Sequence, residues 1–295
     1  MRSGIVTLVG RPNVGKSSLL NAMVGHKVSI VSHKPQTTRH RIQGVLHQEQ
    51  GQIVFVDTPG LHRQQKRALN RVMNEAAVAA IQDVDLIVFV VEAGVWTEED
   101  QAVFERLQHS SAPVGLVINK IDRVKERARL LPELERLGKR HAWAFVVPLS
   151  ALKGDNLRGL ETELFARLPE GPPLYPEDQI VGHDLGFTAA EIVREKLTRS
   201  LHQELPYALT VEIEQYQREG GLDRISAVIW VERDNQKKIV IGENGEHLKR
   251  IGSAARRDLE RETGQKVFLQ LWCKVRENWS DDPKALKRFG LSLGD

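Results

Sequence analysis

The run Gly10-Arg-Pro-Asn-Val-Gly15-Lys16-Ser17 decides the fold of the first part of this 295-residue chain. It follows the apolar segment Ile5–Val9 and precedes a segment with helical spacing, so it lies at a strand-to-helix turn. The spacing of its glycines, lysine and serine is that of a phosphate-binding loop, in which backbone N–H groups and the start of a helix face an anion. We expect Lys16 to reach the β and γ phosphates of a nucleotide and Ser17 to offer its hydroxyl to Mg²⁺.

The residues that we expect to contact a nucleotide lie in the turn itself and at the start of the following helix. They are Gly10, Asn13, Val14, Gly15, Lys16, Ser17 and Ser18.

Short apolar runs alternate with amphipathic segments through residues 1–168. Runs rich in Val and Ile suit strands that are buried on both faces of a parallel sheet, and segments such as Leu69–Ile81 suit helices that cover it. The predicted strands are Ile5–Val9, Ile53–Val56, Leu86–Val91, Val114–Ile118 and Val146–Leu149. The sequence therefore predicts a doubly wound, mostly parallel α/β sheet of the P-loop class.

A cluster of prolines and glycine ends this alternation at residues 169–178, which we assign to a linker. Residues 179–295 then predict a smaller α+β domain in the order helix, strand, strand, helix, helix, strand. Its regular segments are Thr188–Leu201, Leu209–Tyr216, Ile225–Val231, Lys238–Ile241, Glu246–Arg261 and Lys266–Val275.

The composition excludes several classes of protein. The chain is 41% hydrophobic and 27% charged, which is typical of folded, water-soluble proteins. Its single cysteine, Cys273, forms no intramolecular disulfide, and no apolar leader precedes the first strand. The apolar stretch Leu86–Val91 is too short to cross a bilayer. We expect a cytoplasmic monomer and leave open a peripheral contact with the inner face of the cell membrane.

Two further motifs complete the predicted phosphate and metal site. Asp57-Thr-Pro-Gly60 follows a predicted strand, which places Asp57 beside the metal site, where it can hold Mg²⁺ through its water shell, and lets the Gly60 amide meet the γ phosphate. The polar segment Val31–Arg41 contains Thr37 and Thr38 and is interpreted as a mobile loop that a threonine–Mg²⁺ contact orders when a triphosphate is bound.

Asn119-Lys-Ile-Asp122 indicates that the base is guanine. A carboxylate at Asp122 can accept both N–H donors on guanine's pyrimidine edge, and adenine has no such donor pair. We expect Asn119 to bond the purine and tie the loops together, and the stem of Lys120 to pack over the ring. Ser150-Ala151 follows another predicted strand, and a backbone N–H there can reach guanine O6.

In this order, the motifs resemble those of the Era GTPase family, which joins a GTPase domain to a C-terminal type II KH domain. In similar Thr-Thr-Arg motifs the second threonine is the metal ligand, so the resemblance selects Thr38. The segment Val240–Leu248, with Gly242, Glu243, Asn244 and Gly245, is similar to the KH signature, whose Gly-x-x-Gly loop clamps single-stranded RNA. The resemblance implies GTP/GDP and Mg²⁺ as ligands, rRNA near the 3′ end of the small-subunit rRNA as partner, and a role in 16S rRNA maturation and assembly of the small ribosomal subunit.

Clustered positive charge supports an RNA partner. Residues 236–276 carry ten Lys and Arg against five Asp and Glu, whereas residues 179–235 carry six against ten. The acidic Glu243 opposes phosphate in the KH loop, so RNA affinity is expected to rest on basic residues around it, although some of them serve equally well as a solvated face. They are Lys237, Lys238, Lys249, Arg250, Arg256 and Arg257. Trp272 is assigned to the core in preference to base stacking, and Cys273 to the core as a small hydrophobe.

Leu61 follows Gly60 where many GTPases carry a glutamine that orients water, so slow unaided hydrolysis is expected. The resemblance implies that such proteins obtain help otherwise, for which K⁺ near Asn13 is one source. Three alternatives stay open: a P-loop kinase, an RNA-binding chaperone with a vestigial nucleotide pocket, and a related GTPase that acts in tRNA modification. The kinase is disfavoured by Asn119–Asp122, and the vestigial pocket by an intact Lys16. The GTPase that acts in tRNA modification is disfavoured by the KH-like segment.

Overall fold

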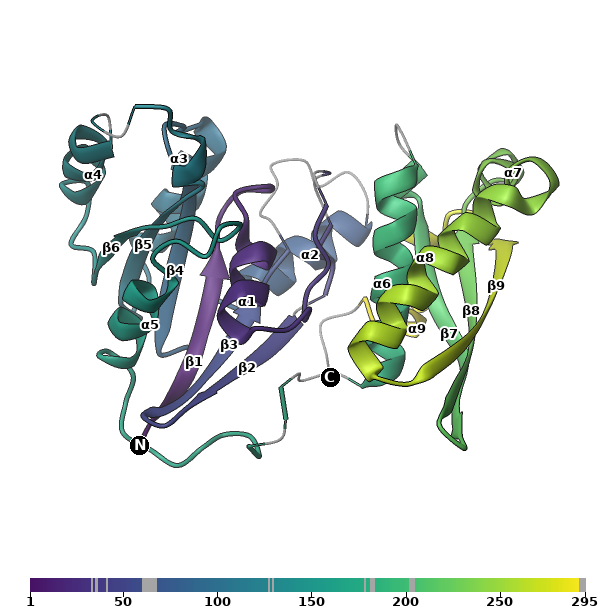
Figure 1. Cartoon of the computed structure of the whole chain (residues 1–295). Coiled ribbons are helices and arrows are strands. Elements are labelled where there is room, and N and C mark those ends of the chain that lie inside the picture. The colour runs from purple at the N-terminus through teal and green to yellow at the C-terminus, as the bar shows by residue number, and fades with distance from the viewer. Residues whose placement is uncertain are drawn as a thin grey trace. The chain divides into compact units, whose positions relative to one another are not determined.

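A six-stranded sheet carries the predicted phosphate loop (Figure 1). The computed structural model describes residues 1–32, 34, 37–40, 42–59, 68–126, 128, 130–177, 179–180, 184–201 and 205–291. Across the sheet, the strands are β2 (Ile42–Gln48), β3 (Gly51–Asp57), β1 (Arg2–Val9), β4 (Leu86–Glu92), β5 (Val114–Asn119) and β6 (Val146–Pro148). All neighbours are parallel except β2, which is antiparallel to β3. The prediction of a mostly parallel α/β sheet is confirmed.

Helices cover both faces of this sheet (Figure 1). On one face lie α1 (Lys16–Val24) and α5 (Leu157–Phe165), and on the other lie α2 (Ala68–Ala79), α3 (Glu98–Leu107) and α4 (Leu130–Gly138). The core between the second set and the sheet includes Ala77 of α2, Phe104 of α3 and Leu137 of α4. Strands packed from both sides leave no room for polar side chains, which explains the unbroken apolar runs in the sequence.

The strand register brings the motif residues to one edge of the sheet. Leu8, near the end of β1, pairs with Asp57 at the end of β3, and Glu92 at the end of β4 pairs with Asn119 at the end of β5. The carboxyl ends of parallel strands form the rim where open α/β sheets bind ligands. The predicted site residues therefore arise from neighbouring strand ends.

The second folded part is a three-stranded sheet with helices on both faces (Figure 1). Its main elements are α6 (Leu185–Ser200), β7 (Leu209–Glu219), β8 (Leu222–Val231), α7 (Asp234–Ile241), α8 (Glu246–Thr263), β9 (Lys266–Val275) and α9 (Pro283–Arg288). Strand β8 is central, antiparallel to β7 and parallel to β9. The predicted order from the first helix to the last strand is confirmed.

The core of this part shows why one sequence expectation was wrong. Cys273 belongs to the apolar cluster under the helices, with residues such as Ile251 and Leu259 of α8. Trp272, its neighbour in β9, is 56% exposed. Consecutive side chains of a strand point to opposite faces, so Cys273 and Trp272 could not both enter the core.

By compactness the chain divides into two units. The first comprises Met1–Ser29, Thr38–Gln65 and Met73–Gly182, and the second comprises Ile30–Thr37, Lys66–Val72 and His183–Asp295. In the described part of the chain, no helix combines the length and the apolar character needed to cross a membrane.

Candidate functional site

The phosphate loop lies between β1 and α1, and the helix begins at Lys16. The N-cap residue, Gly15, has a φ of 103° and supplies no side-chain hydrogen bond to the helix. Because the first N–H groups of any α-helix lack partners within the helix, those of α1 are free to bind an anion. A Cβ on Gly15 would lie 2.3 Å from Asn119 Nδ2, so the loop requires glycine here.

Lys16 is buried beneath this loop. Its Nζ donates to the carbonyl oxygens of Gly10 at 2.8 Å and Arg11 at 3.0 Å. Burial lowers the pKa of Lys16 to about 8, although the Asp57 carboxylate raises it. The ammonium group is thus held at a fixed position in a place that favours an added negative charge, as a phosphate would provide.

Three hydroxyl groups converge on one oxygen of Asp57. Asp57 Oδ2 accepts hydrogen bonds from Ser17 Oγ at 2.6 Å, Ser29 Oγ at 2.9 Å and Thr38 Oγ1 at 3.3 Å. The two hydroxyl oxygens of Ser17 and Thr38 lie 3.0 Å apart. Residues from three separate segments are therefore gathered around one carboxylate, as the sequence predicted for Ser17, Thr38 and Asp57.

The other carboxylate oxygen, Asp57 Oδ1, is buried and has no hydrogen-bond partner among the described residues. Burial raises the pKa of Asp57, whereas Lys16 and the surrounding hydroxyls lower it, and the net direction is upward. An unpaired buried carboxylate oxygen beside hydroxyl groups fits a hard divalent cation such as Mg²⁺, which prefers oxygen ligands. The hydroxyls of Ser17 and Thr38 with the Asp57 carboxylate are therefore the candidate metal site.

Asn119 joins three loops at the end of β5. Its Nδ2 donates to the carbonyl of Val14 at 2.9 Å, and its Oδ1 accepts from the N–H groups of Lys120 at 2.7 Å and Ala151 at 3.0 Å. Asn119 is buried. The predicted tie between loops is therefore present, and the N–H of Ala151, in the Ser150-Ala151 segment that we expected at guanine O6, is directed at Asn119.

The next residues along this loop leave one carboxylate exposed. Asp122 is exposed, and its Oδ1 accepts from Ser150 Oγ at 2.5 Å. Lys120 has a φ of 66°, and its Nζ donates to the carbonyl of Asn13 at 2.6 Å and to Glu92 Oε2 at 2.6 Å. The serine hydroxyl orients Asp122, and Lys120 links this loop to the phosphate loop.

The structure thus brings together the predicted residues of the nucleotide pocket that it describes, while Gly60 and Leu61 lie outside the described residues. Two residues of the site were not predicted from the sequence. Ser29, which bonds Asp57, and Glu92, which receives Lys120 and also pairs with Arg11 and Arg123, belong to none of the motifs. Glu92 had a weak signal, because it ends an apolar strand at the rim; Ser29 had none.

The KH-like loop connects α7 to α8. Gly242, at the end of α7, has a φ of 75°, and a Cβ there would lie 2.6 Å from His247 Cβ. Gly245 has a φ of 78° and open space around it, and Asn244 has a φ of 49°. Residues with positive φ give the loop a tight turn that only glycine and asparagine adopt readily. The turn leaves Glu243 exposed.

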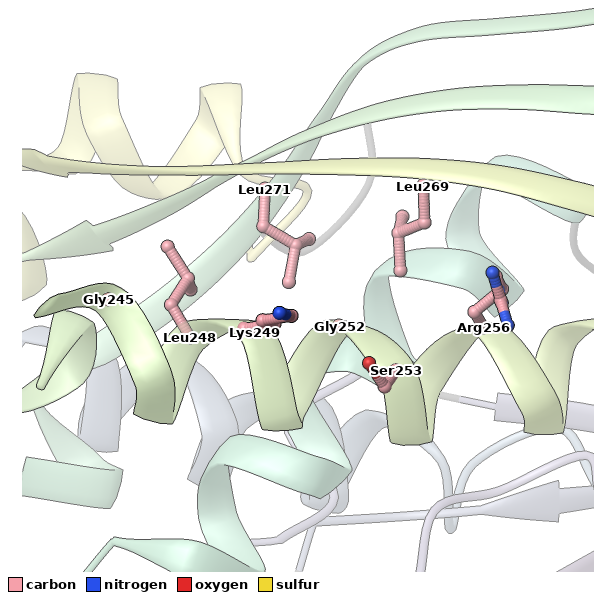
Figure 2. A pocket seen from close by; sticks show the side chains of 8 residues that line it. All are labelled: Gly245, Leu248, Lys249, Gly252, Ser253, Arg256, Leu269 and Leu271. Atoms are coloured by element: carbon pink, nitrogen blue, oxygen red, sulfur yellow. The ribbon is translucent and has the colours of Figure 1, made fainter.

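A groove runs between α8 and β9 beside this loop (Figure 2). Leu248 of α8 and Leu269 and Leu271 of β9 form its apolar surface, and Lys249 and Arg256 supply positive charge. Gly252 lies between these two cations on the same helix, and the lack of a side chain there opens the groove. In such a groove the apolar surface suits contact with nucleic-acid bases, and the cations at its edge suit contact with phosphates.

Only some of the predicted RNA-binding residues line this groove. Gly245, Lys249 and Arg256 do, and they are joined by Leu248, Gly252, Ser253, Leu269 and Leu271, which the sequence reasoning did not select. The remaining predicted residues lie elsewhere on or near the loop and helices: Lys237, Lys238, Gly242, Glu243, Asn244, Arg250 and Arg257. Helical spacing explains part of the difference, since Arg250 and Arg257 are one position past the groove-lining Lys249 and Arg256.

These features define a guanine-nucleotide-binding P-loop protein with an appended KH domain. A family model described as a 50S ribosome-binding GTPase matches residues 5–120, and a KH domain model matches residues 204–280. The chain is 54% identical to the GTPase Era of Xanthomonas oryzae pv. oryzae (strain MAFF 311018) over 289 residues, which cover 98% of this chain and 97% of the relative. It is also 54% identical to the GTPase Era of Stenotrophomonas maltophilia (strain K279a) over 287 residues, 97% and 96% of the two chains. The chain belongs to the Era family of GTPases.

Solved structures agree with this assignment. A variant of Aquifex aeolicus Era bound to GDP and AlF₄⁻ is 40% identical to this chain, with a TM-score of 0.94 over 99% of this chain and 100% of that one. Era in complex with MgGDPNP and nucleotides 1506–1542 of 16S ribosomal RNA matches with the same identity, TM-score and coverage. The α/β GTPase fold and the following α+β KH domain are therefore both confirmed.

Proposed function

We propose that this protein is a Mg²⁺-dependent GTPase switch that binds the 3′ region of 16S rRNA through its KH domain and acts in maturation of that rRNA and assembly of the small ribosomal subunit. The observation that carries the proposal is the convergence of Ser17 and Thr38 on Asp57, beside the buried ammonium of Lys16. The structures of Era with GDP and AlF₄⁻ and with MgGDPNP and 16S rRNA nucleotides support it.

In the proposed phosphate site, Lys16 binds the β and γ phosphates, and the N–H groups at the start of α1 bind the phosphate oxygens. Ser17, Thr38 and Asp57 would hold Mg²⁺, which supplies charge neutralisation on the phosphates. The loop residues Gly10, Asn13, Val14, Gly15 and Ser18 enclose the same phosphates, and the Gly60 amide is assigned to the γ phosphate. Water attacks the γ phosphorus, the bond to the bridging oxygen breaks, and GDP and phosphate leave.

In the proposed base site, Asp122 accepts the two N–H donors of guanine, with Ser150 fixing its orientation through the 2.5 Å hydrogen bond. Asn119 holds the phosphate loop against the base loop through Val14, and Lys120 covers the ring with its stem. The Ser150–Ala151 segment is assigned to the O6 side of the base. A preference for ATP over GTP in a direct binding assay would contradict this assignment and favour a P-loop kinase.

Slow hydrolysis is part of the proposal because Leu61 has no amide to orient water. We assign the missing assistance to a K⁺ ion near Asn13, whose backbone has a φ of 65° and whose carbonyl accepts from Lys120. Hydrolysis rates measured at equal ionic strength in KCl and NaCl test this point. Equal rates in the two salts would remove K⁺ from the account.

Coupling between nucleotide and RNA is supported by contacts of the loop before Thr38. The segment Ile30–Thr37 belongs to the second unit, where Arg194 of α6 donates a hydrogen bond to the carbonyl of Thr37. The next residue, Thr38, has its hydroxyl 3.3 Å from Asp57 Oδ2. We infer that metal binding at Thr38 changes the position of a segment held by α6.

The experiment that tests the function uses the full-length protein and an RNA that corresponds to nucleotides 1506–1542 of 16S rRNA. Its affinity is measured with GDPNP and Mg²⁺ and again with GDP and Mg²⁺, and hydrolysis of GTP is followed in parallel. We expect RNA affinities that differ by about tenfold, or roughly 1.4 kcal/mol, between the two states. Equal affinities would contradict the coupling, and failure to bind the RNA in either state would contradict the RNA partner.

We also assign the RNA contacts to the cations beside the KH loop, with Lys249 and Arg256 in the groove and the others on its approaches. The protein is proposed to work as a cytoplasmic monomer on the small subunit and to reach the inner face of the cell membrane only peripherally. Size-exclusion chromatography with light scattering tests the monomer. Co-sedimentation with vesicles that contain anionic lipid tests the membrane contact.

A further inference from the structure

The face of β9 that points away from the KH groove carries two exposed aromatic side chains. Trp272 is 56% exposed and Phe268 is 46% exposed. They lie four residues apart on the same face of the strand, which corresponds to about 13 Å along the strand. Exposed large aromatic side chains of this kind mark interaction surfaces more often than isolated exposed aliphatic ones.

Positive charge and amide groups accompany these rings. In the strand register Arg224 of β8 is opposite Phe268, with its guanidinium 5.7 Å from the ring centroid. Lys266 is exposed at the start of the same face of β9. Between the rings, Gln270 accepts a hydrogen bond from Ser226 of β8 at 3.4 Å.

The nearby acidic and aromatic residues are engaged elsewhere. Glu214 of β7 pairs with Lys274 at 3.0 Å, and Glu212 pairs with Arg288 of α9 at 2.8 Å. Helix α9 packs on this face at Trp230, where the Phe289 ring lies 6.1 Å from that of Trp230, and Trp230 is opposite Lys274 in the strand register. In the ranges that the structure describes, no ring stacks on Trp272.

The edge strand β9 alone separates this face from the groove. Strand β9 is at the edge of the sheet, so within the described part of the chain its outer side has no neighbouring strand. Its Leu269 and Leu271 point into the groove (Figure 2). Because side chains alternate along a strand, Phe268 and Trp272 occupy the opposite face of β9. A chain that leaves the groove therefore meets the aromatic face after turning around a single strand.

We propose that the back face of β9, defined by Phe268 and Trp272 with Arg224 and Lys266, is a second contact surface for single-stranded RNA that extends beyond the KH groove. The bases stack on the two rings, and the cations bind the phosphates. Single-stranded nucleic acid is the occupant that matches these features, because exposed rings separated by polar groups and flanked by cations suit alternating bases and phosphates, whereas a protein-docking core is depleted of charge. This inference rests on the proposed RNA-binding function.

The test compares two RNAs in the full-length protein. Tiled fragments of 16S rRNA nucleotides 1506–1542 first define the shortest RNA that the wild-type protein binds, which fills the groove, and this RNA is then extended by six nucleotides on its 5′ or its 3′ side. We expect one of the extended RNAs to bind more tightly than the short one. In Trp272→Ala, that gain falls by about 5- to 100-fold while the affinity for the short RNA is unchanged.

Matched variants separate stacking from folding. Trp272→Phe keeps a ring and is expected to retain most of the gain, and Leu185→Ala, which truncates an exposed apolar side chain of α6, is expected to leave both affinities unchanged. Arg224→Gln combined with Lys266→Gln is expected to lower the salt dependence of the extended RNA's affinity by about one to two in log–log slope. Thermal unfolding of each variant confirms that it folds.

Three results would overturn the inference. If Trp272→Ala bound the extended RNA as tightly as the wild type, the face would not contact RNA and would be left to a protein partner. If the variant lost affinity for both RNAs equally while remaining folded, Trp272 would act through the groove. If the wild type bound neither RNA, the proposed RNA-binding function would fail, and the second surface with it.

Discussion

Asn119 Nδ2 donates a 2.9 Å hydrogen bond to the carbonyl of Val14, so the loop that reads the base and the loop that cradles the phosphates are joined by one buried side chain. Because Asn119 Oδ1 also accepts from Lys120 and Ala151, its removal frees three segments at once. We predict that Asn119→Ala weakens both GTP and GDP by about 10- to 100-fold, which corresponds to the loss of one or two buried hydrogen bonds.

Fluorescence titration with labelled GDP and GTP checks this prediction. Asn156→Gly is the control, since Asn156 likewise donates a side-chain hydrogen bond to a backbone carbonyl, that of Pro148, and its φ of 60° suits glycine. That variant should bind nucleotide as the wild type does. An Asn119→Ala protein with unchanged affinity for both nucleotides would show that the link to Val14 does not support the pocket.

The metal site predicts a second result. Among the described residues, Asp57 Oδ1 is buried without a hydrogen-bond partner, and Oδ2 is surrounded by hydroxyls, so the carboxylate charge is the feature that selects a cation. In Asp57→Asn the increase in GTP affinity that Mg²⁺ provides should shrink by about tenfold or more, and hydrolysis should fall below detection. Binding is measured in Mg²⁺ and in EDTA; an undiminished Mg²⁺ effect would place the metal elsewhere.

The KH loop offers a pair of glycines that differ in one respect. Both Gly242 and Gly245 have positive φ, but a Cβ at Gly242 would lie 2.6 Å from His247 Cβ, whereas at Gly245 it would meet open space. Gly245→Ala should cost about 1 kcal/mol of unfolding free energy, and Gly242→Ala should cost about 1–3 kcal/mol more. Urea unfolding measures the loss of unfolding free energy in each variant. Equal losses would mean that His247 moves aside freely.

The only cysteine supplies a probe of this same unit. Burial raises the pKa of Cys273 to about 11 from an ordinary value of 9.0, so at pH 8 only about one thiol in a thousand is ionised in the folded state. Because the folded state holds this proton more tightly, its contribution to stability is present below pH 9 and is lost as the pH rises through 11.

We therefore predict that Cys273 reacts with thiol reagents about 100-fold more slowly in the native protein than in urea. Reaction with an aromatic disulfide reagent, followed by absorbance, measures the rate. Cys273→Val should lack the part of the stability loss between pH 9 and 11 that comes from this thiol. Equal native and unfolded rates would show that β9 opens readily, contrary to its buried inner face.

The sequence predicted those parts of the protein whose signals are local. The phosphate loop, the carboxylate at the end of β3 and the Asn119–Asp122 turn combine residue types at fixed short spacing with a strand before them, and the structure holds them at one rim. The strand β2 was missed because its residues, Ile42–Gln48, mix polar and apolar positions around Gly44. An edge strand with one neighbour does not need the unbroken apolar run of a central one.

Contacts between distant segments could not be read from the sequence. Ser29 reaches Asp57 across 28 residues through a loop with no motif, and Leu269 and Leu271 face the groove only because β9 pairs with β8 in one particular register. The same register puts Trp272 outside and Cys273 inside. A shift of one residue would have exchanged them, which is why residue type alone gave the wrong face for Trp272.

The central claim is that the rim pocket recognises guanine through Asp122, and exchange of that carboxylate tests it most directly. Xanthine carries a carbonyl where guanine carries its amino group, so the amide in Asp122→Asn can pair with xanthine while it opposes guanine. Calorimetric titration of the wild type and Asp122→Asn with GTP, XTP and ATP in Mg²⁺ should give tight binding of GTP alone to the wild type. In the variant, GTP should weaken by about 100-fold or more and XTP should bind better than it does to the wild type. A variant that still preferred GTP with unchanged affinity would contradict the account.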